Sequence, residues 1–278
     1  MIARRAVLAG MAASATMVSV KAAAAGRLSI SGSTEQGGLM VGKAAPGAVV
    51  DLDGVALTVS PSGIFCFGIP YDAAKPLRVT ARFADGFEEL REITPIVRQY
   101  DIQAINGLDE KYVAPPQEIL DRIAREHALI TEARKRVTEG LEFALPIEWP
   151  CAGRLSGIYG SQRILNGKPM APHLGVDVAA PEGTPIHAAA DAIVAITDEF
   201  HLEGGFTLLD HGLGVNTCYL HQSKRLVTAG QRVKRGEVIG LIGHTGRATG
   251  PHTHWGLNWF EVKLDPSRAT ATPTPPQG

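Results

Sequence analysis

The fold follows from a stretch near the C-terminal end of the chain, PHTHWGLNW (residues 251–259). The stretch is typical of a β-strand, in which residues i and i+2 project on the same face with Cα atoms about 6 to 7 Å apart. We therefore expect His252 and His254 to share one face and one small volume. Two imidazoles placed in this way indicate a metal site or an acid–base pair.

The sequence that surrounds this stretch consists of short strands separated by glycine. From about Phe143 onward it contains AAADAIVAITDEF, GGFTLLDHG, GVNTCYLHQ, RLVTAGQRV and GEVIGLIGHTG. This pattern predicts a β domain over residues 143–266. Residues 267–278 are rich in Pro and Thr and lack periodicity, so we expect them to form a disordered tail.

A second candidate element is HLGVD, in which His173 stands four residues before Asp177. In a straight strand the two side chains would be about 13 Å apart, too far for both to reach one ion. The chain must therefore bend, and we expect Gly175 to supply the unusual backbone angles. Alone, such a pair is more often a hydrogen-bonded loop anchor.

A third candidate element is TCYLH, an alternating strand that ends in a histidine. Alternation predicts that Thr217, Tyr219 and His221 share one face, while Cys218 and Leu220 take the other. His221 is then either part of a functional site or a core histidine bound to backbone.

The part of the chain before residue 143 is predicted to contain three units. Arg4 and Arg5, an uncharged Ala-rich run and small residues up to Ala25 are typical of a signal peptide over residues 1–25, too short to span a membrane. Short apolar runs between turn residues predict a β-sandwich-like domain over residues 27–98. Residues 99–142 are expected to be a linker with a helix at about 116–138, packed against one domain.

Composition excludes one class of function. The chain has 278 residues, with 27 Lys and Arg against 28 Asp and Glu, so the formal net charge is −1. No basic field exists that would bind nucleic acid or anionic lipid. The three cysteines, Cys66, Cys151 and Cys218, are too few for a disulfide scaffold. We expect them to be buried.

Taken together, two histidines and one carboxylate form a tripod that suits zinc, and three protein ligands leave a fourth coordination position open for catalysis. Residues from about Ser156 to Pro266 resemble the lysostaphin-type, or LytM-like, zinc endopeptidases. The resemblance is carried by HLGVDVAAPEGTPIHA, LLDHGLGVNTCYLH and VTAGQRVKRGEVIGLIGHTGRATGPHTH, in the order and spacing of the family.

The resemblance implies a mostly antiparallel β domain with a groove. It implies one zinc ion per chain, held by His173, Asp177 and His254, and catalytic histidines at His221 and His252. The substrate would be a peptide of the peptidoglycan cell wall. The N-terminal part is similar to exported members from Gram-negative bacteria, which implies a periplasmic or cell-envelope protein that has no membrane span after maturation.

The sequence also departs from the family pattern and leaves alternatives open. Gly256 stands where an acidic residue often follows the histidine pair, which bears on the surroundings of His254. One alternative is a catalytically silent regulator that binds and activates other wall hydrolases. The partner would then be a wall hydrolase or a regulatory protein. A carrier module of the lipoyl type, suggested by GQRVKRGEVIGLIG, and a metalloprotease with a protein substrate are the others.

Overall fold

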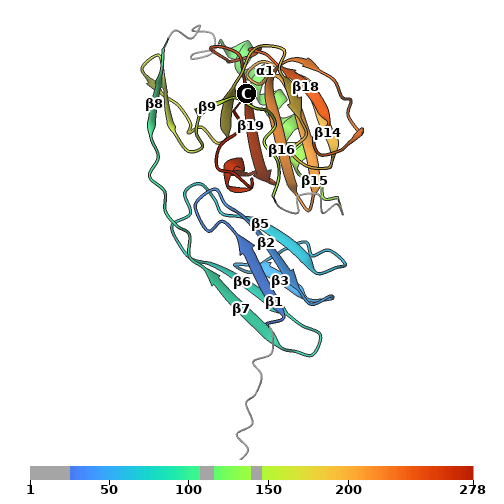
Figure 1. Cartoon of the computed structure of the whole chain (residues 1–278). Coiled ribbons are helices and arrows are strands. Elements are labelled where there is room, and N and C mark those ends of the chain that lie inside the picture. The colour runs from blue at the N-terminus through green and yellow to red at the C-terminus, as the bar shows by residue number, and fades with distance from the viewer. Residues whose placement is uncertain (1–25, 107–115, 139–145, 278) are drawn as a thin grey trace, which may run out of the picture.

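The computed structural model describes residues 26–106, 116–138 and 146–277, and it is mainly β, as the sequence predicts (Figure 1). The predicted signal peptide lies outside the described residues. Within the part of the chain that the structure describes, no helix is both long and apolar enough to cross a membrane.

The N-terminal domain consists of two small antiparallel sheets that share one core. Phe65, Phe67 and Val79 are completely buried between the sheets. The strands of the first sheet are β1 (Leu28–Gly32), β2 (Leu39–Ala44) and β5 (Ile64–Gly68); those of the second are β3 (Val49–Leu52), β4 (Val55–Ala56), β6 (Leu77–Arg82) and β7 (Glu88–Ile93). The arrangement is the predicted sandwich.

The C-terminal domain is built on a ten-stranded antiparallel sheet, whose main order is β17-β14-β15-β16-β19-β12-β9. One face carries the main hydrophobic core, in which Val178, Tyr219 and Trp255 are fully buried. Its strands are β9 (Arg154–Gly157), β12 (Val176–Ala179), β13 (Pro185–His187), β14 (Ala192–Phe200), β15 (Gly204–Gly212), β16 (Val215–Arg225), β17 (Arg232–Val233), β18 (Val238–Ile242), β19 (His252–Trp259) and β20 (Val262–Leu264).

The segment expected to be a linker contains a strand as well as the helix. Strand β8 (Ile102–Ile105) pairs in parallel with β10 (Gln162–Leu165), which in turn pairs with β11 (Lys168–Pro169). The chain therefore enters the C-terminal domain before the helix begins, along the edge where Figure 1 shows β8.

The helix α1 (Gln117–Arg134) packs on the second face of the large sheet. Ile130 is buried there against Phe206 and Leu208, and Glu126 accepts a hydrogen bond of 2.8 Å from the backbone of His201. The helix ends four residues before the predicted position, 138. Beyond it the carbonyl of Thr138 accepts a hydrogen bond from the backbone of Leu213, which draws the chain out of the helical path.

The two domains meet at a polar and aromatic contact. Arg98, which follows β7, forms an ion pair of 2.7 Å with Asp265, whose side chain is 2% exposed. The side chain of Cys66 packs with the C-terminal core and donates to the carbonyl of Leu213. The Asp265 carboxylate also accepts two hydrogen bonds from Ser267 and lies 4.0 Å from Arg268, but Arg98 is its partner from the N-terminal part of the chain, so this buried pair fixes the N-terminal domain against β20.

Residues 267–277 are ordered, in contrast to the predicted tail. A short 3₁₀ helix, η2 (Pro266–Arg268), is followed by carbonyls that accept hydrogen bonds from the segment before β9. Ile147 donates to Ala269 over 3.0 Å, and the Trp149 indole donates to Thr272 over 3.0 Å. Proline and threonine lack an apolar periodicity, but their carbonyls remain free to accept these bonds.

The side chain of His127 on α1 lies 3.2 Å from that of Glu203, and this contact gives a pH-dependent prediction. The hydrogen bond to Glu203 raises the pKa of His127, while burial opposes the shift; burial pushes the pKa of Glu203 up, but His127 brings it below its usual value. The pair therefore stabilises the fold between about pH 4.5 and 6.5 and loses its effect as the pH rises through the folded-state pKa of His127.

We expect His127→Gln to lower the melting temperature by about 1 to 2 °C at pH 5.5, since half-exposed pairs contribute about 0.2–1 kcal/mol. At pH 8.5 wild type and variant should melt at the same temperature. Thermal unfolding followed by circular dichroism at both pH values checks this. A difference that is equal at the two pH values would show that the ion pair is not its cause.

Candidate metal centre

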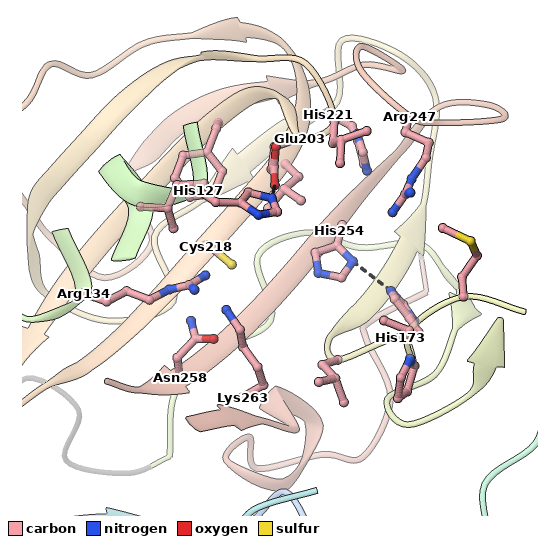
Figure 2. Close-up of a pocket in the computed structure, with 18 residues that line it drawn as sticks. His127, Arg134, His173, Glu203, Cys218, His221, Arg247, His254, Asn258 and Lys263 are labelled. Atoms are coloured by element: carbon pink, nitrogen blue, oxygen red, sulfur yellow. Dashed lines mark hydrogen bonds and ion pairs between the residues drawn. The ribbon is translucent and has the colours of Figure 1, made fainter. Parts of the chain in front are cut away.

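Three side chains converge on the second face of the large sheet. Asp177 and His254 are direct neighbours across β12 and β19, and His173 lies in the loop before β12. His173 Nε2 is 2.8 Å from His254 Nδ1 and 3.0 Å from Asp177 Oδ1, and His254 Nδ1 is 2.9 Å from Asp177 Oδ1. Figure 2 shows His173 and His254 pointing toward one another. These residues offer a nearly equilateral triangle of ligand atoms.

The bend that brings His173 back toward Asp177 is fixed by backbone hydrogen bonds. His173 donates to the carbonyl of Ser161 over 2.9 Å and accepts from the backbone of Gly160 over 2.7 Å. The predicted bend is therefore present. The predicted role of Gly175 is wrong, because its φ is not in the positive region.

Gly175 is required for space, not for backbone angles. A Cβ atom at this position would lie 2.5 Å from Nε2 of His254 and 2.9 Å from the carbonyl oxygen of Trp255. A Cβ on Gly157 would likewise lie 2.3 Å from Oδ2 of Asp177. Gly175 thus leaves space for the His254 ring, and Gly157 leaves space for the Asp177 carboxylate.

The three side chains of the triangle have too few protons to satisfy one another by hydrogen bonds, which favours a bound cation between them. His173 Nδ1 lies 3.2 Å from the carbonyl oxygen of Ile158, to which it donates, so its Nε2 carries a lone pair. That lone pair faces the Asp177 carboxylate, which is itself an acceptor. A single proton on His254 Nδ1 can be donated either to His173 Nε2 or to Asp177 Oδ1, but not to both. Ligands of a tetrahedral zinc ion at about 2.1 Å stand about 3.4 Å apart, so a widening of each side of the triangle by about half an ångström would accommodate the ion.

Two further histidines stand beside the triangle, and each is held through its Nδ1 by a backbone carbonyl. His221 Nδ1 donates to the carbonyl of Thr245 over 2.8 Å, and His252 Nδ1 donates to that of Gly250 over 2.8 Å. Their ring centroids are 4.7 Å apart, and His252 Nε2 is 3.9 Å from Asp177 Oδ1. Because each Nδ1–H is engaged, each ring retains Nε2 for proton transfer or hydrogen bonding.

His221 reaches this face only through a break in its strand. Alternation predicts that it lies with Thr217 and Tyr219, and this prediction is wrong. Tyr219 is buried in the main core, whereas His221 lines the pocket at the triangle together with Leu220. The φ of His221 is +64°, and the pairing of β15 with β16 shifts register at this point. Left-handed backbone at a non-glycine residue costs about 1–3 kcal/mol, and here it turns the ring to the site.

The buried position of the site sets its electrostatics. Burial pushes the pKa of Asp177 up, but His173 and His254 hold it well below its usual value. Burial, with smaller contributions from His252 and His254, lowers the pKa of His221 to about 3. The carboxylate is thus ionised and the His221 ring neutral near pH 7.

A pocket of about 370 Å³ opens beside the triangle and is lined by residues from α1, β16, β19 and β20. Sequence reasoning gave His127 no role and did not single out Glu203, Arg134 or Lys263, all of which line it (Figure 2). Their types alone carry no signal, since charged residues on a helix or in a turn are ordinarily solvated. Only the docking of α1 on the sheet brings them together.

The departure at Gly256 has a local explanation. A Cβ atom there would lie 2.6 Å from Sγ of Cys218, so the thiol on β16 occupies the room next to this position. Cys218 is buried and free, like Cys66 and Cys151, in agreement with the sequence. The remaining buried histidine on β15, His211, bonds to the carbonyl of Asp191 and the hydroxyl of Thr217, away from the site.

We expect Gly175→Ala to lower zinc affinity by about 10- to 100-fold, the usual effect of disturbing the support of a metal ligand, because the added methyl group displaces the His254 ring. Gly250→Ala is the matched control, since a Cβ there meets nothing within 4 Å. Competition with a chromophoric chelator measures both affinities. Equal zinc affinity in the two variants would contradict the close packing of Gly175 on the ring.

Comparison with known sequences agrees with this geometry. The sequence pattern of Peptidase family M23 matches residues 171–266. The peptidoglycan DD-endopeptidase ShyA of Vibrio cholerae is 48% identical over 90 residues, which is 32% of this chain and 21% of the relative. ShyB of the same organism, also named a peptidoglycan DD-endopeptidase, is 30% identical over 170 residues, 61% of this chain and 36% of the relative. The matched stretches thus span a minor part of these relatives.

A solved structure extends the likeness to both domains. A Pseudomonas aeruginosa protein described as a peptidase M23 is 32% identical, with a TM-score of 0.64, and the match covers 85% of this chain and 94% of that one. The likeness thus includes the N-terminal sandwich as well as the domain that carries the histidines. Identity at this level over nearly the whole of a solved relative establishes kinship, and the chain belongs to peptidase family M23.

Proposed function

We propose that the chain is a zinc-dependent endopeptidase that hydrolyses peptide cross-links of bacterial peptidoglycan. The observation that carries the proposal is the triangle of His173, Asp177 and His254, with sides of 2.8–3.0 Å, beside two histidines that keep Nε2 available. The names of the Vibrio cholerae relatives, which are peptidoglycan DD-endopeptidases, support the choice of substrate.

His173, Asp177 and His254 would hold one zinc ion per chain through two nitrogens and one oxygen. Three protein ligands leave a coordination position for water or substrate, which is the arrangement of a catalytic zinc site. When bound, the ion supplies a Lewis acid for the scissile carbonyl and lowers the pKa of water to about 7.

His252 and His221 would transfer protons and stabilise the negative charge that develops on the carbonyl oxygen. Each ring is fixed through Nδ1, so Nε2 can take a proton from the attacking water, return it to the leaving amine, or donate a hydrogen bond to the carbonyl oxygen. The left-handed backbone of His221 supports this role, because strained residues are retained where the site needs the orientation.

A regulator without catalytic activity is the alternative, and it would be expected to lack part of this set. All five candidate residues are present and lie together, which favours the enzyme. The signal-peptide pattern of residues 1–25 and the peptidoglycan relatives support export to the periplasm of a Gram-negative bacterium. Another wall hydrolase or a regulatory protein would be its partner there.

We expect His254→Ala to lose both zinc and activity, whereas His252→Ala loses activity and retains most of the zinc. The loss of rate for His252→Ala should be at least about 100-fold, as for removal of a general acid–base group. Zinc content by atomic emission and peptide hydrolysis on the same samples test this. His244→Ala, which alters an exposed histidine paired with Glu182, is the control and should behave as wild type. Equal zinc loss in the His252 and His254 variants would refute the assigned roles.

The decisive measurement of function is release of soluble fragments from purified peptidoglycan by the protein without residues 1–25. We expect about one zinc per chain, as the three ligands imply, and products that mass spectrometry identifies as cleaved cross-links. Treatment with a chelator should stop the release, and added zinc should restore it. Intact cross-links at full zinc occupancy would exclude the endopeptidase, and activation of a second wall hydrolase under those conditions would identify the regulator.

A further inference from the structure

The pocket beside the metal centre contains two cations that catalysis at the triangle does not use. Arg134 comes from the last turn of α1 and Lys263 from β20. Figure 2 shows their side chains pointing toward one another, on the side of His254 away from His173. Both line the same pocket as His173, His221 and His254.

Arg134 is buried without adequate compensation. Its side chain is 9% exposed, and its Nη1 lies 3.6 Å from the carboxylate of Glu261, which is itself 50% exposed. The buried Nε finds no hydrogen-bond acceptor among the described residues. A cation in the last turn of a helix is favoured by the helix dipole, which explains its charge but not its burial. A buried, unsatisfied guanidinium donor calls for an acceptor.

Lys263 has a similar environment. Within the described ranges, no carboxylate lies within ion-pair distance of its ammonium group. Burial, and then the charge of Arg134, lower the pKa of Lys263 to about 8. Two cations that repel each other in a buried space would both be stabilised by a shared anion.

The rest of the pocket supplies one carboxylate, Glu203, whose buried Oε2 makes no hydrogen bond, and within the described ranges no ion pair joins Glu203 to Arg134 or Lys263. Glu203 is the carboxylate among the lining residues, and its Oε1 is engaged with His127. Arg247 adds a further cation to the lining. The volume of about 370 Å³ is within the range of sites for small ligands, so the pocket has room for an amino-acid-sized group.

We propose that Arg134 and Lys263 form a carboxylate subsite, which selects peptides that carry a free carboxylate beside the bond to be cleaved. The proposal rests on the proposed peptidase function for the identity of the ligand. A guanidinium and an ammonium that face one pocket bind a carboxylate by charge-assisted hydrogen bonds, whereas a carboxamide offers one neutral acceptor and no charge. The subsite would therefore act on binding, and so on KM more than on kcat.

The test compares two forms of one probe. A monomeric peptidoglycan stem peptide, which contains no cross-link, is prepared with a free terminal carboxylate and as the carboxamide, and binding to the zinc-loaded protein is measured by calorimetry. We expect wild type to prefer the acid by at least about tenfold. Arg134→Gln and Lys263→Gln should each reduce that preference by about fivefold or more, while Lys263→Arg keeps it.

Lys135→Gln is the matched control, because Lys135 is exposed, next to Arg134 in the chain, and paired with Glu132. It should keep the wild-type preference. Unchanged zinc content and melting temperature show that the Lys263 variant remains folded even where Arg134→Gln does not. Equal binding of acid and amide by wild type, or an unchanged preference in a folded Lys263→Gln protein, would overturn the subsite.

Hydrolysis of the cross-linked dimer separates this proposal from the proposed function. Preference for the acid form without any cleavage of the dimer keeps the subsite and removes the endopeptidase. Cleavage of the dimer, together with equal affinity for the acid and amide forms of the monomer, keeps the endopeptidase and overturns the subsite. In the expected case, amidation of the dimer raises KM by about tenfold with little change in kcat, and Lys263→Gln reduces that difference by about fivefold or more.

Discussion

The pairing of β12 with β19 is the constraint on which the site depends. It sets Asp177 directly opposite His254, so one carboxylate and one imidazole share a face at hydrogen-bond distance. The neighbouring residues are consistent with this contact: Gly157 and Gly175 leave space for the two side chains, and backbone bonds to His173 close the triangle. Any side chain larger than hydrogen at either glycine would collide with a member of the set.

The two faces of the large sheet differ in what they carry. One face is a continuous hydrophobic core with Val178, Tyr219 and Trp255. The other carries the triangle, the two further histidines and, beside them, α1 with its own small apolar contact at Ile130. The histidines could therefore be gathered without placing unpaired polar groups in the main core, where their desolvation would be costly. His221 is the exception to strand alternation, and its left-handed backbone is the local cost of reaching the second face.

The N-terminal domain supports the same region from outside. Arg98 holds Asp265, two residues beyond Lys263, while Tyr159 of the C-terminal domain itself donates a hydrogen bond of 2.9 Å to the carbonyl of Lys263. The sandwich therefore braces β20, the strand that carries one of the two pocket cations. In this way a domain without candidate catalytic residues bears on the shape of the site.

The sequence by itself predicted the β character of both domains and the helix, because these depend on local spacing, while the roles of the five candidate residues came from its resemblance to the lysostaphin-type endopeptidases. A strand places His252 and His254 on one face wherever it packs, and HLGVD must bend if both ends are to meet. Tertiary structure alone decided the rest. The face of His221, the steric role of Gly175 and the order of residues 267–277 depend on neighbours distant in sequence. Arg134 and Lys263 meet only because α1 docks on the sheet, and no local pattern encodes where a helix packs.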